Sequence, residues 1–337
     1  MFISFFHVLN KHNHLNYFVI FTSVLGSCSE VHDAITGVVG SWQKTIDGIK
    51  RCLKVKMHIT PNIVMSKANA LDILATAKML ATIGCNDMQV DFASRPSNCS
   101  DFSAFDLTCD EKINVLKHID IINQHCGIKA WNLARIPFCL VPELTSNLEY
   151  FSPGCGAGKS GCNIGADGIA RACAMEQAIS IKSINDFSLI DLWQEFDERG
   201  TDTYVPVDCR DCKLLYKCGG GCRFAGCSAT GRKDGCDPLM KKVNVERVFK
   251  MLLSHQQDVQ QSITHNTKIT FSNFGIRDEE FGAVVWNGRT QQFVNISGKS
   301  FLRNIVVGKE YLLNRNISEN YKEFLTDLVI GGFASVS

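Results

Sequence analysis

Cysteine is concentrated in one stretch of this chain. Of its 16 cysteines, nine lie between Cys155 and Cys236, and the other seven are scattered. A local excess of thiols in a chain of 337 residues indicates a metal site or a disulfide framework at that place. The same stretch is rich in glycine and poor in apolar periodicity, so it has little core of its own and needs a metal or crosslinks to fold.

The composition excludes several classes of protein. A chain that is 45% hydrophobic and 20% charged is not disordered. Its 35 basic and 34 acidic residues leave a net charge of +1, and no polybasic run is present, so we expect no nucleic-acid partner and no membrane surface. Neither apolar block in residues 1–27 reaches the roughly 18 residues of a membrane span. The scattered single cysteines favour reduced thiols and a cytoplasmic location.

Residues 1–145 alternate between strand and helix patterns. Strands are predicted at 18–23, 58–65, 88–92 and 127–133, and helices at 41–53, 69–83 and 110–124. Strands separated by helices of this length indicate βαβ units and a parallel sheet, and four such strands amount to half of a barrel. Residues 25–28 also resemble a lipoprotein cleavage box, but a buried strand at 18–23 is the simpler interpretation.

The rest of the chain divides into three predicted parts. Residues 146–240 form the cysteine-rich domain, with one short helix near 186–196, and residues 241–266 form a helical linker. Residues 267–337 contain Asn287-Gly288, a strong hairpin signal, and predict a small α+β domain. Its strands are expected at 282–286 and 291–294, and its helices at 298–306 and 318–330.

The cysteines follow a defined spacing. Four of them form the pattern C-x2-C-x5-C-x3-C: Cys209, Cys212, Cys218 and Cys222. The pattern C-x12-G-x4-C precedes it and consists of Cys155, Gly168 and Cys173. Thiolates are soft ligands, and sets of four sulfurs bind zinc or iron–sulfur clusters. The glycines at 219–221 would let the backbone wrap closely and direct amides at sulfur.

Three interpretations of these thiols compete. Structural zinc often recruits histidine, but no histidine lies between His125 and His255, and a zinc ribbon with four cysteines would need C-x2-C twice. Disulfides would leave the nine cysteines unevenly paired. Two [4Fe–4S] clusters would use eight and leave one spare. The spacing favours iron–sulfur, with zinc and disulfides as the alternatives.

The combined pattern, completed by a later cysteine, resembles the SPASM domain of radical S-adenosylmethionine (SAM) enzymes. The resemblance implies one auxiliary [4Fe–4S] cluster on Cys155, Cys162, Cys173 and Cys222. It implies a second auxiliary [4Fe–4S] cluster on Cys209, Cys212, Cys218 and Cys236. Cys227 is then the spare. Cys236 is preferred as the last ligand because the family has a longer gap there and because Asp237-Pro238 resembles its usual surroundings.

The resemblance extends upstream. Residues 23–26 and those that follow resemble the fourth strand and next helix of a radical SAM barrel, and residues 61–69 and 88–96 resemble the fifth and sixth strands. In that family these strand ends contact SAM, so the resemblance implies that Ser23 and Asn69 bind this cofactor. The alternative for each is a helix cap or a turn residue.

The chain departs from the family in one respect. The C-x3-C-x2-C motif that binds the catalytic cluster is absent from the sequence. We therefore expect an α/β protein: a partial (β/α) radical SAM barrel lacking its first strands, a cysteine-rich SPASM domain, and a small α+β winged-helix-like domain. Three hypotheses explain the absence of the C-x3-C-x2-C motif: a gene fragment, a separate chain that carries the SAM-binding half, or a degenerate scaffold. SAM would bind only if the missing half of the barrel, with its C-x3-C-x2-C motif, is supplied. Whether the chain is part of an enzyme depends on whether that half is present.

Residues 267–337 resemble PqqD-like domains, in which a leader peptide adds a strand to a sheet edge. A winged-helix-like packing domain without a ligand is the alternative. Together the resemblances imply a radical SAM/SPASM maturase acting on a precursor peptide or protein. Ala174 follows Cys173 where sulfatase-maturing relatives have aspartate, which disfavours that branch. A non-catalytic iron–sulfur and leader-peptide-binding scaffold and a zinc-ribbon interaction protein are the other hypotheses.

Overall fold

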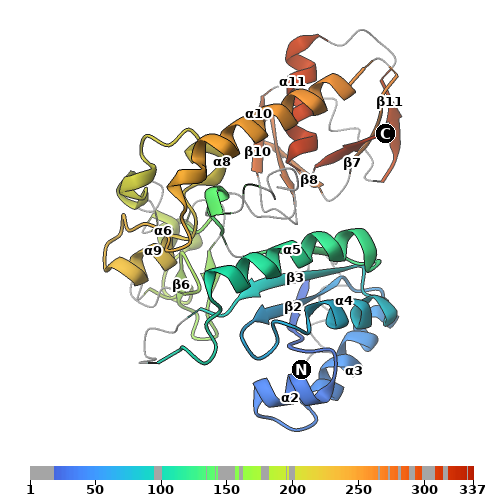
Figure 1. The fold of residues 1–337 in the computed structure, drawn as a ribbon, viewed down its shortest axis with the longest axis vertical. Coiled ribbons are helices and arrows are strands. Elements are labelled where there is room, and N and C mark those ends of the chain that lie inside the picture. The colour runs from blue at the N-terminus through green and yellow to red at the C-terminus, as the bar shows by residue number, and fades with distance from the viewer. Residues whose placement is uncertain are drawn as a thin grey trace. The chain divides into compact units, whose positions relative to one another are not determined.

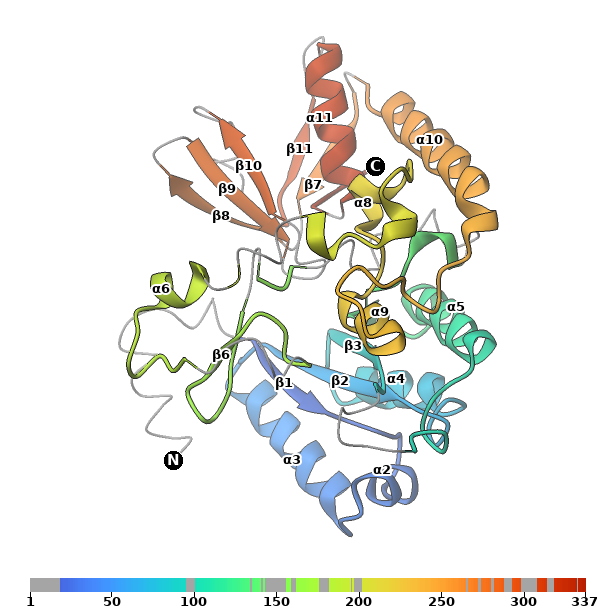
Figure 2. The ribbon, with the colours of Figure 1, turned by 90° about the vertical axis from the view of Figure 1, so that its left-hand side faces the viewer.

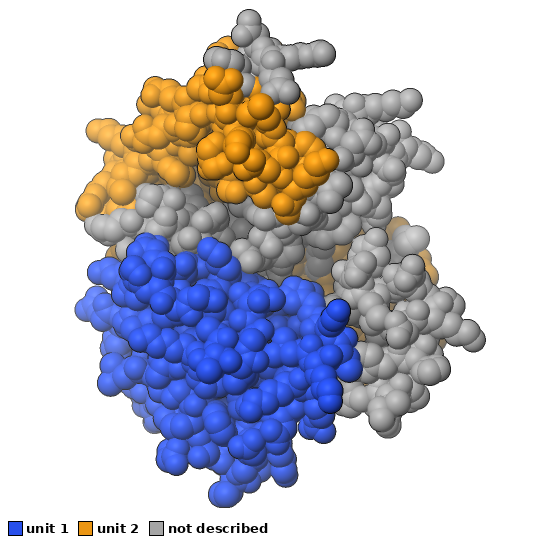
Figure 3. Space-filling model, turned by 90° about the vertical axis from the view of Figure 1, so that its right-hand side faces the viewer, with its two compact units in different colours: residues 1–133 blue, residues 134–337 orange. Residues whose placement is uncertain are grey.

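The chain forms two compact units, residues 1–133 and residues 134–337 (Figure 3). The computed structural model describes residues 19–94, 101–133, 135–140, 142, 156–158, 162–175, 182–194, 196, 202–264, 266–271, 274–279, 282–287, 293–297, 308–313, 318–331 and 333–337. No helix in these ranges combines the length and the apolar character that a membrane crossing requires.

The first unit is built on a four-stranded parallel sheet (Figure 1). Its strands follow one another in space as in sequence: β1 (Ile20–Ser23), β2 (Ile59–Met65), β3 (Asp87–Phe92) and β4 (Lys129–Asn132). Its helices are α2 (Ser29–Thr36), α3 (Ser41–Lys54), α4 (Ile73–Thr82) and α5 (Cys109–His125). The parallel α/β sheet expected from the alternating patterns is confirmed, and α2 is an addition to the predicted elements.

Apolar side chains of the strands and helices form the core of this unit. Ile63 and Met65 of β2 and Met88 and Val90 of β3 are at most 1% exposed. Helix α3 packs on β2, α4 on β3 and α5 on β4. Burial of these side chains stabilises the unit through the hydrophobic effect, which explains why the apolar periodicity located its strands.

Helix α4 begins later than expected. The predicted helix starts at residue 69, whereas α4 begins at Ile73 after a turn. The reason is the side chain of Asn69, whose Oδ1 accepts the backbone N–H of Ser66 at 2.8 Å. Asparagine commonly bonds nearby backbone groups in this way and so favours a turn over a helix. Helix α5 starts within one residue of its prediction, where Thr108 and Glu111 form a capping box.

The second unit opens with the cysteine-rich segment, whose regular elements are short. They are β5 (Asn163–Ile164), β6 (Ala170–Arg171), α6 (Leu189–Gln194), α8 (Leu215–Cys218) and α9 (Arg223–Thr230). Helix α10 (Val245–Ser262) follows. Val248 and Leu252 of α10 are buried with Phe138, Leu214 and Cys218. The predicted helical linker is therefore a packed part of this unit.

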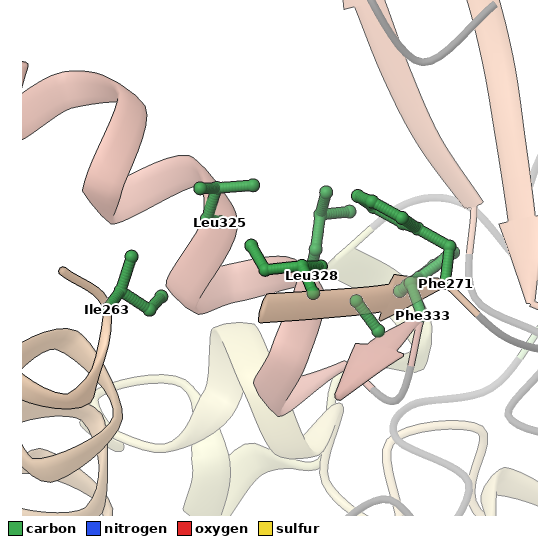
Figure 4. Close-up of a cluster of buried hydrophobic side chains, with 7 residues drawn as sticks. Ile263, Phe271, Leu325, Leu328 and Phe333 are labelled. Carbon is green, nitrogen blue, oxygen red and sulfur yellow. The ribbon is translucent and has the colours of Figure 1, made fainter. Parts of the chain in front are cut away.

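The last part of the chain contains two small sheets. Strand β7 (Lys268–Phe271) lies between β11 (Glu310–Leu312) and β12 (Ala334–Val336), and both pairs are antiparallel. Helix α11 (Glu319–Ile330) joins their core, in which Phe271, Leu325, Leu328 and Phe333 pack together (Figure 4). The predicted helix at 318–330 is confirmed, while the one at 298–306 lies outside the described residues.

The other sheet is antiparallel and has the order β10-β9-β8 (Figure 2). Its strands are β8 (Phe274–Glu279), β9 (Gly282–Asn287) and β10 (Phe293–Ser297). Strands β9 and β10 pair from Trp286 with Phe293 to Gly282 with Ser297. The predicted pairing of these two strands is confirmed, with the second strand starting two residues later than expected, while Gly288 and the rest of the turn lie outside the described residues.

Candidate metal centre

A tight turn after α8 joins the last two cysteines of the C-x2-C-x5-C-x3-C pattern, Cys218 and Cys222. Helix α8 ends at Cys218, and the three glycines that follow have φ angles of 68°, 81° and 77°. Only glycine adopts this left-handed region without penalty, and three in succession reverse the chain within one turn. A Cβ on Gly220 would lie 3.0 Å from Pro206 Cδ, and one on Gly221 would lie 2.7 Å from Asp237 Oδ2. The triple glycine is therefore required by both backbone angle and space.

Four thiols line one cavity in the second unit: Cys139, Cys209, Cys212 and Cys218. Three of them are almost fully buried, with 5–7% of Cys139, Cys209 and Cys218 exposed. The rest of the lining is mainly backbone and aliphatic side chains, together with Asp208, Met240 and Lys242. The structure thus brings together the three members of the pattern that the SPASM resemblance assigns to the second cluster.

Backbone amides point at two of these sulfurs. The N–H of Phe138 donates to Cys218 Sγ at 3.3 Å, and the amides of Gly220 and Gly221 also bond this sulfur. Lys241 N–H donates to Cys139 Sγ at 3.4 Å. Amide donors stabilise a thiolate relative to a thiol and are the usual outer contacts of cluster-ligating sulfurs. The glycine amides reach sulfur as the sequence pattern predicts.

The thiols raise one another's pKa. Burial, followed by the neighbouring Cys218, Cys212, Cys236 and Cys139, raises the pKa of Cys209 to about 12. Burial is also the main cause that raises the pKa of Cys139 to about 11. These groups are therefore neutral thiols at pH 7 unless a cation is bound among them. A metal centre reverses this balance, because coordinated thiols lose their protons.

Cys236 lies beside this site. It is close enough to Cys209 to raise the pKa of that thiol, and a hydrogen bond joins it to the Asp208 carboxylate. Asp208 also pairs with Lys242, whose Nζ is 2.8 Å from Oδ1. Cys236 is partly exposed and is not among the described residues that line the cavity.

The ligand set of the first predicted cluster is described only in part, because Cys155 lies outside the described residues. Cys162 packs against Ala170, Ala172, Leu192 and Phe196. Cys222 precedes α9 and its Sγ accepts the N–H of Ala225 at 3.4 Å. Gly168, at φ 75°, turns the chain between β5 and β6, and a Cβ there would come within 2.9 Å of Ser183 Oγ. This set stays a prediction.

The residues around the cavity fit a cluster. In a [4Fe–4S] cluster each cysteine binds a different iron, so the ligands surround a central space, and four cysteines are among the residues that line this cavity. The donor set is all sulfur, with amides aimed at two of the sulfurs, which suits the soft iron of such clusters. Across the part of the chain that the structure describes, no three His, Cys, Asp or Glu side chains are close enough to hold one metal ion.

The two predicted SAM-binding residues have different surroundings. Asn69 is buried, and besides accepting from Ser66 it donates through Nδ2 to the carbonyls of Leu25 (3.1 Å) and Val64 (3.0 Å). Each polar atom of its side chain therefore bonds the backbone, which favours the turn-residue alternative.

Ser23, by contrast, is exposed at the carboxyl end of β1. It pairs in register with Asn62 of β2, which pairs with Gln89 of β3, so these three polar residues share one face of the sheet. The Oδ1 atom of Asn62 is buried and lacks a hydrogen-bond partner among the described residues. The carboxyl ends of parallel strands are the usual place for ligands in α/β barrels, so Ser23 stays a candidate.

Cys139 lines the cavity but is not part of the cysteine pattern. It counts among the scattered cysteines of the sequence, and 15 residues separate it from Cys155. The available signal is its place in Pro137-Phe138-Cys139, a few residues before the predicted cysteine-rich domain.

Comparison with solved structures identifies the fold. The chain is similar to the crystal structure of Streptococcus suis SuiB, with a TM-score of 0.52, 18% sequence identity, and coverage of 66% of this chain and 54% of SuiB. SuiB bound to S-adenosylmethionine and SuiB bound to the precursor peptide SuiA match with the same TM-score and 16% identity. The chain thus spans about half the length of SuiB. No protein-family model and no curated protein matches the sequence.

The chain therefore shares the α/β fold of SuiB, with a parallel sheet in its first unit. SuiB has been crystallised with S-adenosylmethionine and with the precursor peptide SuiA, so the likeness agrees, at the level of the fold, with the radical SAM/SPASM resemblance that the sequence predicts.

Proposed function

We propose that this chain belongs to a radical SAM/SPASM system that modifies a peptide or protein, and that its cysteine-rich domain binds auxiliary [4Fe–4S] clusters. The observation that carries the proposal is the convergence of Cys209, Cys212 and Cys218 on one cavity, with three backbone amides on the Cys218 sulfur. The fold that the chain shares with SuiB supports the same class of function.

The residues around the cavity would ligate the cluster and stabilise its charge. Thiolates from the cavity would ligate the cluster, and a bound cluster supplies reversible one-electron transfer. The amides of Phe138, Gly220 and Gly221 would stabilise the negative charge on sulfur. Apolar side chains such as Leu214 and Val248, which are buried beside Cys218, would exclude water from one side of the cluster. Ligand type, hydrogen bonds to sulfur and exclusion of water together set the reduction potential of a cluster.

A first cluster on Cys155, Cys162, Cys173 and Cys222 is part of the same proposal. Its support is the SPASM spacing together with the close fit at Gly168, where a Cβ would lie 2.9 Å from Ser183 Oγ and 3.0 Å from Asn185 Nδ2. SAM would bind where a C-x3-C-x2-C segment is supplied, whether by residues encoded upstream or by a separate chain.

The proposed substrate is a precursor peptide. SuiB has been crystallised with its precursor peptide SuiA. In the present chain, β8 and β10 are the outer strands of the antiparallel sheet β10-β9-β8, and an extended peptide can add to such an edge. A PqqD-like role for residues 267–337 is thus part of the proposal.

Anaerobic purification with iron and sulfide analysis tests the proposal. Two [4Fe–4S] clusters require about eight iron atoms per chain and as much sulfide. Cys209→Ala should remove about half of the iron, whereas Cys85→Ala, which removes a buried thiol in the first unit, should not change it. A colourless protein with stoichiometric zinc, or thiols joined as disulfides, would contradict the proposal.

The absence of C-x3-C-x2-C from the sequence favours a second candidate, a non-catalytic iron–sulfur and leader-peptide-binding scaffold. The discriminating observation is the DNA upstream of the codon for Met1. An in-frame C-x3-C-x2-C there restores the enzyme. A stop codon without a neighbouring maturase gene favours the scaffold.

A further inference from the structure

Cys139 faces the same cavity as three predicted cluster ligands. It lies in the short 3-10 helix Phe138–Leu140 and is 5% exposed. Together with Cys209, Cys212 and Cys218 it completes a set of four sulfurs around the cavity. Four cysteines are the full complement of a [4Fe–4S] cluster.

The turn that carries Cys139 is tied to the site at several points. Phe138 donates its N–H to Cys218 Sγ, and the Cys139 carbonyl accepts from Asn244 Nδ2 at 2.9 Å. The Cys139 sulfur itself accepts the N–H of Lys241 at 3.4 Å. These bonds span between 80 and 105 residues of sequence, so tertiary folding holds the sulfur in place. An amide donor on a buried sulfur is the contact expected of a ligating thiolate.

Cys236, the last ligand in the sequence pattern, has different surroundings. Its side chain bonds the Asp208 carboxylate, which also pairs with Lys242. It is partly exposed, and it is not one of the described residues lining the cavity. Cys139 is therefore better buried and better directed toward the cavity than Cys236.

We infer that Cys139 is a ligand of the [4Fe–4S] cluster at this cavity and holds, with Cys209, Cys212 and Cys218, the position that the sequence pattern gives to Cys236. This inference rests on the proposed function, since it requires a cluster at the site. On binding, the Cys139 S–H bond breaks, its proton passes to solvent, and a sulfur–iron bond forms without a change of electron count in the protein.

Three matched variants of the full chain test the inference: Cys139→Ala, Cys236→Ala and Cys85→Ala. Cys85 is a suitable control because it is 3% exposed, similar to Cys139, and lies in the first unit. Each protein is purified anaerobically, its fold is checked by circular dichroism, and its iron, sulfide and electron paramagnetic resonance spectrum are measured. Cys139→Ala should lose about half of the iron of the wild type or show a three-iron cluster, while the other two variants should match the wild type.

A Cys139→Ala protein with wild-type iron content and spectrum overturns the inference, and so does loss of iron from Cys236→Ala. If Cys139→Ala does not fold, alkylation of the native wild type replaces it. Rapid labelling of Cys236 while the iron stays bound supports the inference. Protection of Cys236 until the iron is chelated overturns it. A wild type without iron instead refutes the proposed function, so the two failures are distinguishable.

Discussion

Substitution of Gly221 by alanine should damage the metal centre through one buried carboxylate. Gly221 has φ 77°, and a left-handed conformation costs an L-residue about 1–2 kcal/mol. The new Cβ would lie 2.7 Å from Asp237 Oδ2 and 2.9 Å from Asp237 Cβ, which is too close. Asp237 is buried and accepts N–H bonds from Cys222 and Leu239, each at 2.8 Å, so it cannot move away without breaking them.

The loss of one such bond to a charged group is worth about 1.5–3 kcal/mol, so we expect Gly221→Ala to destabilise the region by roughly 3–5 kcal/mol in all. Gly231→Ala is the matched control. Gly231 also has a left-handed φ, 72°, but a Cβ there meets nothing within 4 Å. The control should therefore lose only about 1–2 kcal/mol.

The assay is urea titration of the anaerobic holoprotein, followed by the visible absorption of the cluster and by iron release to a chelator. Gly221→Ala should lose its cluster at a clearly lower urea concentration than Gly231→Ala. Equal midpoints for the two variants would refute the reasoning, because the left-handed backbone would then account for the whole effect.

Three further predictions concern the thiols, the turn after β2 and the partly buried carboxyl of Asp91. Cys212→Ala should remove about half of the iron and loosen the surrounding segment, because metal binding supplies much of its folding energy, whereas iron analysis of Cys227→Ala should match the wild type. Asn69→Ala should lower the unfolding free energy of the first unit by about 2–4 kcal/mol, since it leaves three backbone groups without partners, but should leave iron content unchanged; a parallel loss of iron would contradict this. Burial raises the pKa of Asp91 to about 6, so the folded state prefers the protonated form, and stability from this group should fall as the pH rises from about 4 to about 6. Asp91→Asn should abolish that part of the decline in a pH series of tryptophan-monitored unfolding, and an unchanged slope would contradict it.

The strands and helices of the first unit could be predicted because the spacing of apolar residues along the sequence shows which side chains are buried. The apolar alternation of β2 and β3 reflects which side chains the core takes up, such as Ile63 and Val90. The start of α4 could not be predicted from this pattern, because Asn69 accepts the N–H of Ser66 in a turn and is also held by a bond to Leu25, which is 44 residues away in sequence. Helix boundaries set by distant partners leave little local signal.

The same distinction separates the cysteines. Cys209, Cys212 and Cys218 could be predicted as one group because short spacings allow a single loop to present them. Cys139 could not, because it reaches the site through the packing of Phe138 with Leu214 and Val248. Helix α10 forms where the sequence predicts a helix, but the burial of its Val248 and Leu252 depends on residues that precede them by as many as 114 positions. Contacts of this kind are decided by tertiary structure.

The most direct test of the central claim is a Mössbauer spectrum of the full chain, produced anaerobically with isotopically enriched iron. If the cysteine-rich domain holds [4Fe–4S] clusters, the spectrum will show the quadrupole doublets of such clusters, with about eight iron atoms per chain. Protein that folds with one zinc ion per chain and gives no iron signal would contradict the account.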